Sequence, residues 1–246
     1  MIRRNIIISQ TPETAAEEAV FIWQKTASRA ILTRGHYTMA LSGGMTPDIF
    51  YRKLSDPAHR FLWEKISIFL VDERFVPYTD SQSNYAMIND HLFKRIPIPP
   101  QNVFPIPIRG TPQNSALEYD AKLRSFFRVT PARPIPRFDL IVLGIGQDGR
   151  TASLFEGDPR IYTADRFVIA TKHLSLPHPQ ISMTLALINN AAHVMFLVTG
   201  RHKARTVFEV LNQAKETSAT KVSPATGELT FVLDKEAGSL VKDMTK

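Results

Sequence analysis

Residues 138–155 read FDLIVLGIGQDGRTASLF, an apolar run followed by three glycines and an arginine. The run from Phe138 to Leu143 is short and mostly apolar, which is typical of a strand buried inside a sheet. A glycine-rich loop directly after such a strand can bring backbone amides close to a ligand. This stretch therefore indicates an α/β fold and marks residues 144–153 as a candidate ligand loop.

The rest of the chain alternates between extended and helical patterns. Further strands are predicted at residues 37–41, 66–71, 166–170, 193–198 and 229–233. Apolar residues at helical spacing predict helices at residues 12–34, 83–92, 116–127 and 203–211, and a helical stretch that ends at residue 54. Strands separated by helices predict a three-layer α/β architecture, a mainly parallel sheet with helices on both faces. We expect residues 1–246 to form one domain, because this length is common for a single α/β domain.

The composition excludes several kinds of chemistry. The chain contains no cysteine, which excludes disulfides, thiolate nucleophiles and cysteine-ligated zinc. The apolar part of the N-terminal sequence MIRRNIIISQ is too short for a signal peptide, and no stretch reaches the roughly 20 apolar residues that span a bilayer. These features predict a cytoplasmic protein with no membrane partner.

The formal charge of +7 favours an anionic partner. Nucleic acid is not predicted, because the chain has no nucleic-acid-binding motif and no basic stripe interleaved with aromatic residues. The densest basic stretch holds only Arg201, Lys203 and Arg205. Two interpretations stay open: a solvated basic surface, or a site for a phosphorylated small molecule.

Four loops that follow predicted strands carry polar or glycine-rich sequence. They are residues 42–47, 72–77, 144–153 and 199–203. Ligands of open parallel sheets bind beyond the carboxyl ends of the strands. We therefore expect these four loops to line one cleft.

The first loop, Ser42-Gly43-Gly44, has the features of an anion site. Its glycines would let backbone amides approach a phosphate, and the helix that follows would add its partial positive charge. Thr46 is the expected N-cap of that helix and Pro47 its first residue. The alternative is a tight turn without a ligand, since glycine tolerates positive φ. The P-loop pattern is absent, which excludes a standard nucleoside triphosphate site.

Three charged residues in the other loops are candidates for the same cleft. Arg74 offers a planar guanidinium for bidentate phosphate binding, and Lys203 offers a point charge. Asp72 could order a base or a sugar hydroxyl. The alternatives are charges that merely cap a strand and a lysine on the surface.

The third loop formally matches the dinucleotide fingerprint through Gly144, Gly146 and Gly149. That fingerprint also requires a long helix after the loop and an acidic residue at the end of the next strand. Here Glu156-Gly-Asp-Pro159 interrupts almost at once, and the next predicted strand ends in Thr171-Lys172. A nicotinamide or flavin site is therefore not predicted.

Four motifs together resemble those of the 6-phosphogluconolactonase family, in the same order and at similar spacing. They are LSGGMTP (41–47), VDERFVPYTDSQSNYAMINDHLF (71–93), GIGQDGRTASLFEG (144–157) and TGRHKA (199–204). The resemblance implies a glucosamine-phosphate-isomerase-like fold, a modified Rossmann arrangement, with no metal and no organic cofactor. It also implies a monomer or homodimer that hydrolyses 6-phospho-D-glucono-1,5-lactone in the oxidative pentose phosphate pathway.

The same resemblance implies a set of substrate-binding residues. Five of them would hold the phosphate and hydroxyls of the substrate: Ser42, Gly43, Gly44, Arg74 and Lys203. The site would extend to further positions in the same loops: Thr46, Gly146, Asp148 and Gly149.

Two positions depart from the family pattern. The family loop reads DGHTASLF, with the histidine as the proposed general base, whereas this chain has Arg150 there. A guanidinium stays protonated below about pH 12, so it cannot take a proton from water at neutral pH. The family also has an arginine in a P-x-R-I-T stretch, where this chain has Gln180.

Three hypotheses follow from these departures. In the first, Arg150 stabilises the oxyanion at C1 and His178 is the general base, because a histidine titrates near neutral pH. In the second, Asp72 is the base, which requires desolvation of its carboxyl group. In the third, catalysis is weak or lost and the protein only binds phosphosugars. An isomerase or deaminase on the same fold is a further alternative.

Overall fold

The computed structural model describes residues 4–59 and 61–241, and the side chains of residues 45–47 are outside that description. Within this part of the chain, the larger sheet has seven parallel strands in the order β1-β10-β9-β6-β2-β3-β5. In that order the strands are β1 (Arg4–Ser9), β10 (Glu228–Asp234), β9 (His193–Val198), β6 (Leu140–Leu143), β2 (Tyr37–Leu41), β3 (Ile66–Leu70) and β5 (Val103–Phe104).

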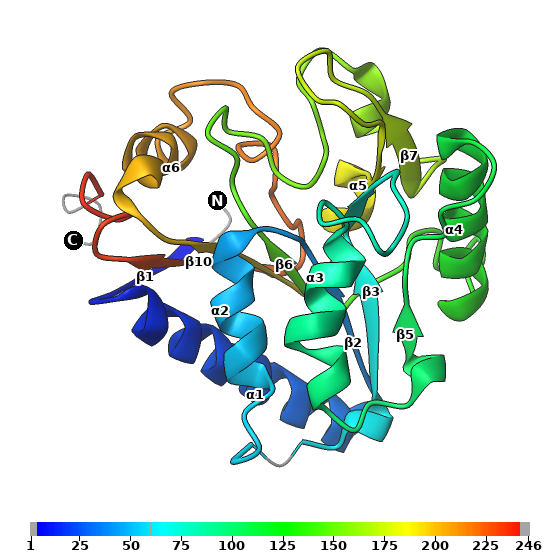
Figure 1. Ribbon diagram of the computed structural model, residues 1–246, viewed down its shortest axis with the longest axis horizontal. Helices are drawn as coiled ribbons and strands as arrows, with labels where there is room; N and C mark the ends of the chain where they lie inside the picture. The colour runs from blue at the N-terminus through cyan, green and yellow to red at the C-terminus, as the bar shows by residue number, and fades with distance from the viewer. Residues whose placement is uncertain (1–3, 60, 242–246) are drawn as a thin grey trace.

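Helices cover both faces of this sheet. They are α1 (Pro12–Arg34), α2 (Met45–Leu54), α3 (Asn84–His91), α4 (Pro112–Phe126), α5 (Leu185–Ile188) and α6 (Ala204–Leu211). Figure 1 shows α1 on one side of β1 and β10 and α6 on the other side. The predicted three-layer α/β architecture with a mainly parallel sheet is confirmed.

Local sequence signals account for the first helix. The side chain of Thr11 accepts a hydrogen bond from the amide of Thr14, whose hydroxyl accepts from the amide of Thr11, and Pro12 occupies the first helical turn. Gly35 ends the helix at φ 78°, a left-handed conformation that glycine adopts without steric cost. These are the signals that predicted a helix at residues 12–34.

A second, antiparallel sheet was not predicted. It contains β4 (Asp72–Arg74), β8 (Gln180–Met183) and β7 (Val168–Thr171) in that order, and α4 packs on β7 and β8. The prediction of a loop at residues 72–77 is therefore wrong for its first three residues. Strands of three and four residues are too short for a periodic pattern, and tertiary pairing alone forms them.

Further differences from the predictions concern β1, α2 and α4. Strand β1 was missed, although its isoleucines pair with β10 along its whole length. Helix α2 begins at Met45 with Gly44 as its N-cap, so the prediction of Thr46 as N-cap and Pro47 as first residue is wrong. The chain turns at Gly44, with φ 116°, because glycine can adopt that value. Helix α4 begins at Pro112 after an N-cap at Thr111, four residues before the predicted start.

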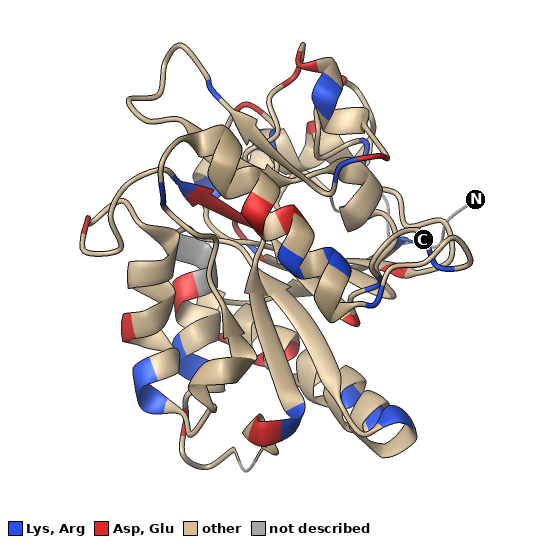
Figure 2. Cartoon of the chain, turned by 90° about the vertical axis from the view of Figure 1, so that its right-hand side faces the viewer, with Lys and Arg blue, Asp and Glu red and all other residues tan. Residues whose placement is uncertain are grey.

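The basic charge of the chain is not gathered into a stripe. Figure 2 shows acidic and basic residues interspersed over the elements that face the viewer. None of the helices described is both long and apolar enough to cross a bilayer.

Candidate active site

One cleft of about 520 Å³ lies at the carboxyl ends of four adjacent strands. Strands β9, β6, β2 and β3 are neighbours in the sheet, and each is followed by one of the four predicted loops. Because the strands are parallel, their carboxyl ends lie side by side and the loops converge. The residues that line the cleft include Ser42, Gly43, Gly44, Asp72, Arg74, Gly146, Arg150 and Lys203.

The Ser42-Gly43-Gly44 loop passes close to the side chain of Asn84. A Cβ atom on Gly43 would lie 1.8 Å from Oδ1 of Asn84, so only glycine fits there. The Asn84 Nδ2 group donates to the carbonyl oxygen of Asp72 at 2.9 Å, and the Tyr51 hydroxyl donates to the carbonyl of Ser42. The Ser42 hydroxyl is buried and has no hydrogen-bond partner among the described residues. Ser42 thus lines the cleft with a buried hydroxyl that no described residue engages.

Asp72 is the buried carboxyl group of the cleft. It is 7% exposed, and its Oδ2 atom accepts a hydrogen bond of 2.6 Å from the Ser153 hydroxyl. Burial raises the pKa of Asp72, while Ser153, Arg74 and Arg150 oppose that rise. The desolvation that a carboxylate base requires is therefore present at Asp72.

Glu73, the next residue, holds the loop and the start of α3 in place. Its carboxylate accepts hydrogen bonds from the backbone amides of Arg74, Asn84 and Tyr85, and from the Ser83 hydroxyl, at 2.7–3.0 Å. Burial raises the pKa of Glu73 to about 7, against the effect of these donors. Glu73 thus satisfies first-turn amides of α3 and fixes the position of Arg74.

We expect Glu73→Ala to lower the stability of the protein by about 3 kcal/mol or more, because four donors, two of them in buried and two in partly buried hydrogen bonds, would lose their acceptor. For a chain of this size the thermal midpoint should fall by roughly 6–12 °C. Thermal denaturation followed by circular dichroism measures the change. The exposed Glu64→Ala is the matched control, and a midpoint equal in the two variants would contradict the prediction.

The two arginines of the cleft have different fixed partners. Arg74 donates through Nη1 to the carbonyl oxygen of Gln82 at 2.6 Å. Arg150 donates through Nη1 to Oδ2 of Asp148 at 2.7 Å, and its guanidinium carbon lies 5.3 Å from the centre of the Phe155 ring. Burial acts to raise the pKa of Asp148, but the amide and guanidinium of Arg150 overcome it and lower the pKa. Both guanidiniums keep further N–H groups for a ligand.

The glycine-rich loop after β6 is shaped by its own residues. Asp148 and Gly149 are not among the residues that line the cleft. Gly149 takes φ +85°, and a Cβ on Gly146 would lie 2.5 Å from Oδ1 of Asp148. Within the described residues the loop leads into turns and not into a helix, so it lacks the helix start that a dinucleotide site requires.

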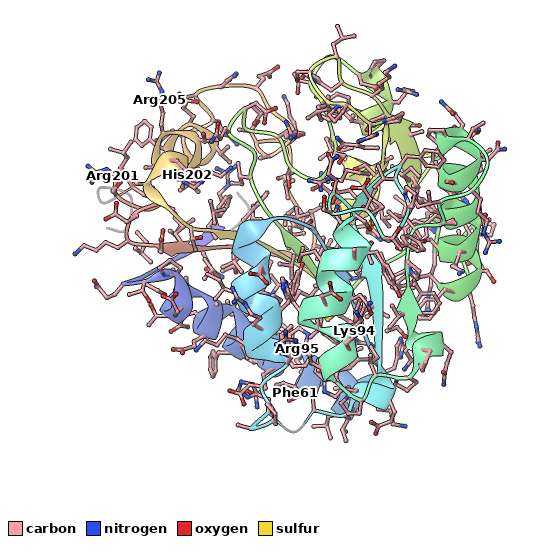
Figure 3. All side chains as sticks on the ribbon, viewed as in Figure 1. Phe61, Lys94, Arg95, Arg201, His202 and Arg205 are labelled. Carbon is pink, nitrogen blue, oxygen red and sulfur yellow. The ribbon has the colours of Figure 1, made fainter. Side chains whose placement is uncertain are left out.

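Of the three cations Arg201, Lys203 and Arg205, only Lys203 lines the cleft within the described residues. Its Nζ atom donates to the carbonyl oxygen of Ile145 at 2.7 Å, and burial lowers the pKa of Lys203. Arg201 and Arg205 point outward from the start of α6 in Figure 3, with side chains 86% and 87% exposed. This stretch therefore holds both an exposed basic surface and one ammonium group that lines the cleft.

A smaller pocket of about 90 Å³ adjoins the cleft and contains His178. Asp72, Arg74 and Arg150 line both spaces, whereas His178 and Gln180 line the small pocket. Gln180 pairs with Arg74 across β8 and β4. The structure therefore brings both predicted candidates for the base beside Arg150.

The side chain of Thr46 lies outside the described residues.

Sequence reasoning missed four polar contributors. Asn84 and Ser153 stand inside the motifs that carry the family resemblance, but neither residue type signals a supporting contact across 12 or 81 positions. Gln147 and His202 line the cleft next to predicted residues. No group of three His, Cys, Asp or Glu side chains suited to a metal ion occurs among the described residues.

The amino-acid sequence is similar to those of known proteins. Residues 10–231 match the family described as glucosamine-6-phosphate isomerases/6-phosphogluconolactonase. A 6-phosphogluconolactonase of Synechocystis sp. is 36% identical over 226 residues, which are 90% of this chain and 92% of the relative. That of Homo sapiens is 32% identical over 96% of this chain and 92% of its own.

Solved structures give the same result. The structure of 6-phosphogluconolactonase from Trypanosoma cruzi superimposes with a TM-score of 0.87 at 26% identity, and the match covers 100% of this chain and 99% of that one. The resemblance stated from the four motifs is confirmed. The chain belongs to the glucosamine-6-phosphate isomerase/6-phosphogluconolactonase family.

Proposed function

We propose that this protein hydrolyses 6-phospho-D-glucono-1,5-lactone to 6-phosphogluconate in the oxidative pentose phosphate pathway. Family membership and the names of the relatives support this activity. The observation that carries the proposal is the desolvated Asp72 carboxyl group, set between Arg74 and Arg150 in a cleft that also holds a glycine anion loop.

The substrate would be bound through its phosphate and hydroxyl groups. Lys203 and Arg74 supply an ammonium and a guanidinium, and the Gly43-Gly44 backbone supplies amides at the start of α2. Ser42 lines the same cleft and is the proposed contact to a sugar hydroxyl. This set gives a site for a phosphorylated, polyhydroxylated acid derivative.

Asp72 is the proposed general base. Its carboxylate takes a proton from a water molecule while the oxygen of that water bonds to C1 of the lactone. Arg150 donates hydrogen bonds to the oxyanion that forms on the carbonyl oxygen. When the tetrahedral intermediate collapses, the bond from C1 to the ring oxygen breaks and that oxygen takes the proton back from Asp72. The product acid then releases a proton and becomes a carboxylate.

Arg150 is thus proposed as an electrophile in place of the histidine of the family loop, with the base in a different residue. His178 is the alternative base, because it lines the small pocket with Asp72 and Arg150. Asp72 is preferred since it also lines the cleft of Lys203 and the glycine loop, and since burial strengthens it as a base.

A coupled assay tests the function. Glucose 6-phosphate is oxidised to the lactone by its dehydrogenase, and formation of 6-phosphogluconate is followed after correction for spontaneous ring opening. A rate above the spontaneous one that increases in proportion to protein concentration is expected. No increase would contradict catalysis and leave a phosphosugar-binding protein, while ammonia release from glucosamine 6-phosphate would instead identify a deaminase.

Replacement of Lys203 by Gln should mainly weaken substrate binding. Loss of one charge-assisted contact to phosphate costs about 1.5–3 kcal/mol, which corresponds to a rise in KM of roughly 10- to 100-fold with a smaller change in kcat. Steady-state kinetics in the coupled assay measure both constants. Lys215→Gln removes an exposed ammonium outside the cleft and is the control. A variant with unchanged KM would remove Lys203 from the phosphate site.

A cytoplasmic location is also proposed. The absence of cysteine is compatible with the reducing cytoplasm, where the substrate would be produced. The monomeric or dimeric state and the lack of a cofactor stay predictions.

A further inference from the structure

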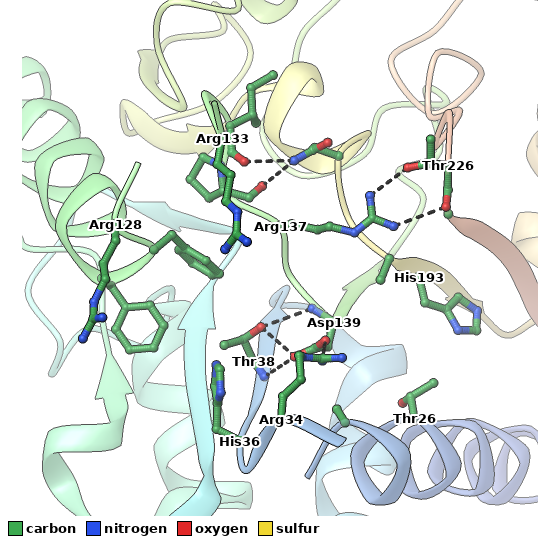
Figure 4. Close-up of a pocket in the computed structure, with 18 of the residues that line it drawn as sticks. Thr26, Arg34, His36, Thr38, Arg128, Arg133, Arg137, Asp139, His193 and Thr226 are labelled. Atoms are coloured by element: carbon green, nitrogen blue, oxygen red, sulfur yellow. Dashed lines mark hydrogen bonds and ion pairs between the residues drawn. The ribbon is translucent and has the colours of Figure 1, made fainter. Parts of the chain in front are cut away.

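A second, larger pocket lies at the other end of the sheet from the cleft. It has a volume of about 1270 Å³ and is shown in Figure 4. Its lining includes the residues that begin or precede the strands: His36 before β2, Asp139 before β6, Ala192 before β9 and Glu228 at the start of β10. Since the strands are parallel, these amino ends are opposite the carboxyl ends that form the cleft. The two spaces are therefore separate.

Arginine dominates this pocket, which we call the arginine pocket. Among the described residues, five arginines and two carboxylates line it: Arg29, Arg34, Arg128, Arg133 and Arg137, with Asp139 and Glu228. Two of the arginines belong to α1, and three belong to the connection between α4 and β6. Elements far apart in the sequence thus bring five arginine residues, all of them exposed, to the lining of one pocket.

The two carboxylates offset only part of the charge of the five arginines. Asp139 is occupied by Arg34 and by the backbone amide and hydroxyl of Thr38, at 2.9 and 3.0 Å. Glu228 has a side chain that is 68% exposed and lies 4.0 Å from His193. Figure 4 shows the Arg34, Asp139 and Thr38 group at one side of the pocket. An anion entering the pocket would meet one carboxylate already paired and one turned to solvent.

Three of the guanidinium groups have no partner among residues 4–59 and 61–241. Within the described residues, no hydrogen bond or ion pair engages the side chains of Arg29, Arg128 or Arg133. Figure 4 shows the Arg133 side chain reaching into the space of the pocket, the Arg137 side chain extending toward Thr226, and Arg128 at the opposite side. Arg137 is held by the hydroxyl and carbonyl oxygens of Thr226 at 2.7 and 3.2 Å. The pocket therefore presents several guanidinium donors without an acceptor of their own.

The connection that carries these arginines has a defined shape. The Nδ2 group of Asn190 donates to the carbonyl oxygens of Ile135 and Pro136 at 3.0 Å each. The backbones of Thr130 and Arg133 pair with each other, and Arg128 takes φ 49°, which is uncommon for a residue other than glycine. Fixed backbone positions lower the ordering cost when a ligand engages these side chains.

We propose that the arginine pocket is a second anion site, which binds a small molecule that carries two or more linked phosphate groups. Guanidinium groups match phosphate oxygens in a bidentate manner, and several unpartnered ones around one cavity suit several charges on one ligand. The pocket is larger than the cleft, which suits a ligand larger than a sugar monophosphate.

Isothermal titration calorimetry with inorganic tripolyphosphate tests the proposal. All proteins carry Lys203→Gln, which weakens phosphate binding in the cleft. We expect tripolyphosphate to bind at least ten-fold more tightly than inorganic phosphate. The double variant Arg128→Asn, Arg133→Gln should lose at least ten-fold in affinity, and asparagine tolerates the left-handed backbone at residue 128. A parallel titration with ATP distinguishes a nucleotide ligand from a polyphosphate ligand. If ATP binds more tightly than tripolyphosphate, the pocket is assigned to nucleotides. If ATP binds more weakly, the pocket is assigned to the phosphate chain alone.

The double variant Lys215→Gln, Lys235→Gln removes the same charge from exposed positions outside the pocket and is the matched control. It should bind tripolyphosphate within two-fold of the parent. Equal affinity in the arginine and lysine variants, or no heat of binding in the parent, overturns the proposal. An unchanged thermal transition shows that each variant is folded. Lactonase activity is measured separately, so a failure of the proposed function is distinguishable from a failure here.

Discussion

Replacement of Asp72 by Asn is expected to lower kcat by about 100- to 10,000-fold, the range that a positioned general base contributes. Asparagine keeps the shape of the side chain and can still accept the hydrogen bond of the Ser153 hydroxyl, but it cannot take a proton from water. Substrate binding should change less than kcat. The coupled assay measures the rate, and calorimetric titration with 6-phosphogluconate measures binding.

The pH dependence gives an independent measurement. The folded pKa of Asp72 is raised by burial, so kcat/KM of the wild type should fall as the pH drops through that raised value. The acid limb should be absent in Asp72→Asn. A raised folded pKa also means that Asp72 adds stability at low pH and that this contribution is lost as the pH rises. At neutral pH the Asn variant should be at least as stable as the wild type.

His178→Ala is the comparison variant for Asp72→Asn. If Asp72 is the base, His178→Ala should keep kcat within about ten-fold of the wild type, which is below the usual contribution of a general base. Full activity in Asp72→Asn together with loss of activity in His178→Ala would transfer the base to the histidine. The structure allows either result, because both residues line the small pocket.

Arg150→Ala should lower kcat by about 100- to 1000-fold, the usual cost of removing one oxyanion donor. Arg150 lines both the cleft and the small pocket together with Asp72, and its positive charge favours the charged form of that carboxyl group. Loss of Arg150 should therefore also shift the acid limb of the pH profile to higher pH, because the carboxyl group loses a stabilising positive charge.

Arg205→Ala is the control for Arg150→Ala, since it removes an exposed guanidinium that points away from the cleft (Figure 3). It should leave kcat and the pH profile unchanged. Arg150→His introduces a titratable imidazole at this position, and activity above that of Arg150→Ala would show that this position can also hold a base. An Arg150→Ala enzyme with wild-type kcat would exclude the oxyanion role.

The sequence was informative wherever a signal is local. The apolar runs at residues 37–41 and 193–198 predicted their strands with the observed bounds, and Thr11, Pro12 and Gly35 marked the first helix. The short strands β4 and β8 gave no such signal, because pairing with each other and with β7 forms them. The start of α2 was misplaced since Gly44 caps it through its backbone conformation, without a side-chain hydrogen bond.

The sequence by itself determined the α/β class, the family and the four loops, because strand periodicity, caps and motifs are properties of neighbouring residues. Only the tertiary structure decided which groups act together. Contacts between distant segments determine three features: the burial of Asp72, the close approach of the Asn84 side chain to Gly43, and the five arginines near the amino ends of the strands. Desolvation and charge proximity arise when such segments pack, so they set the properties of the site after the fold is formed.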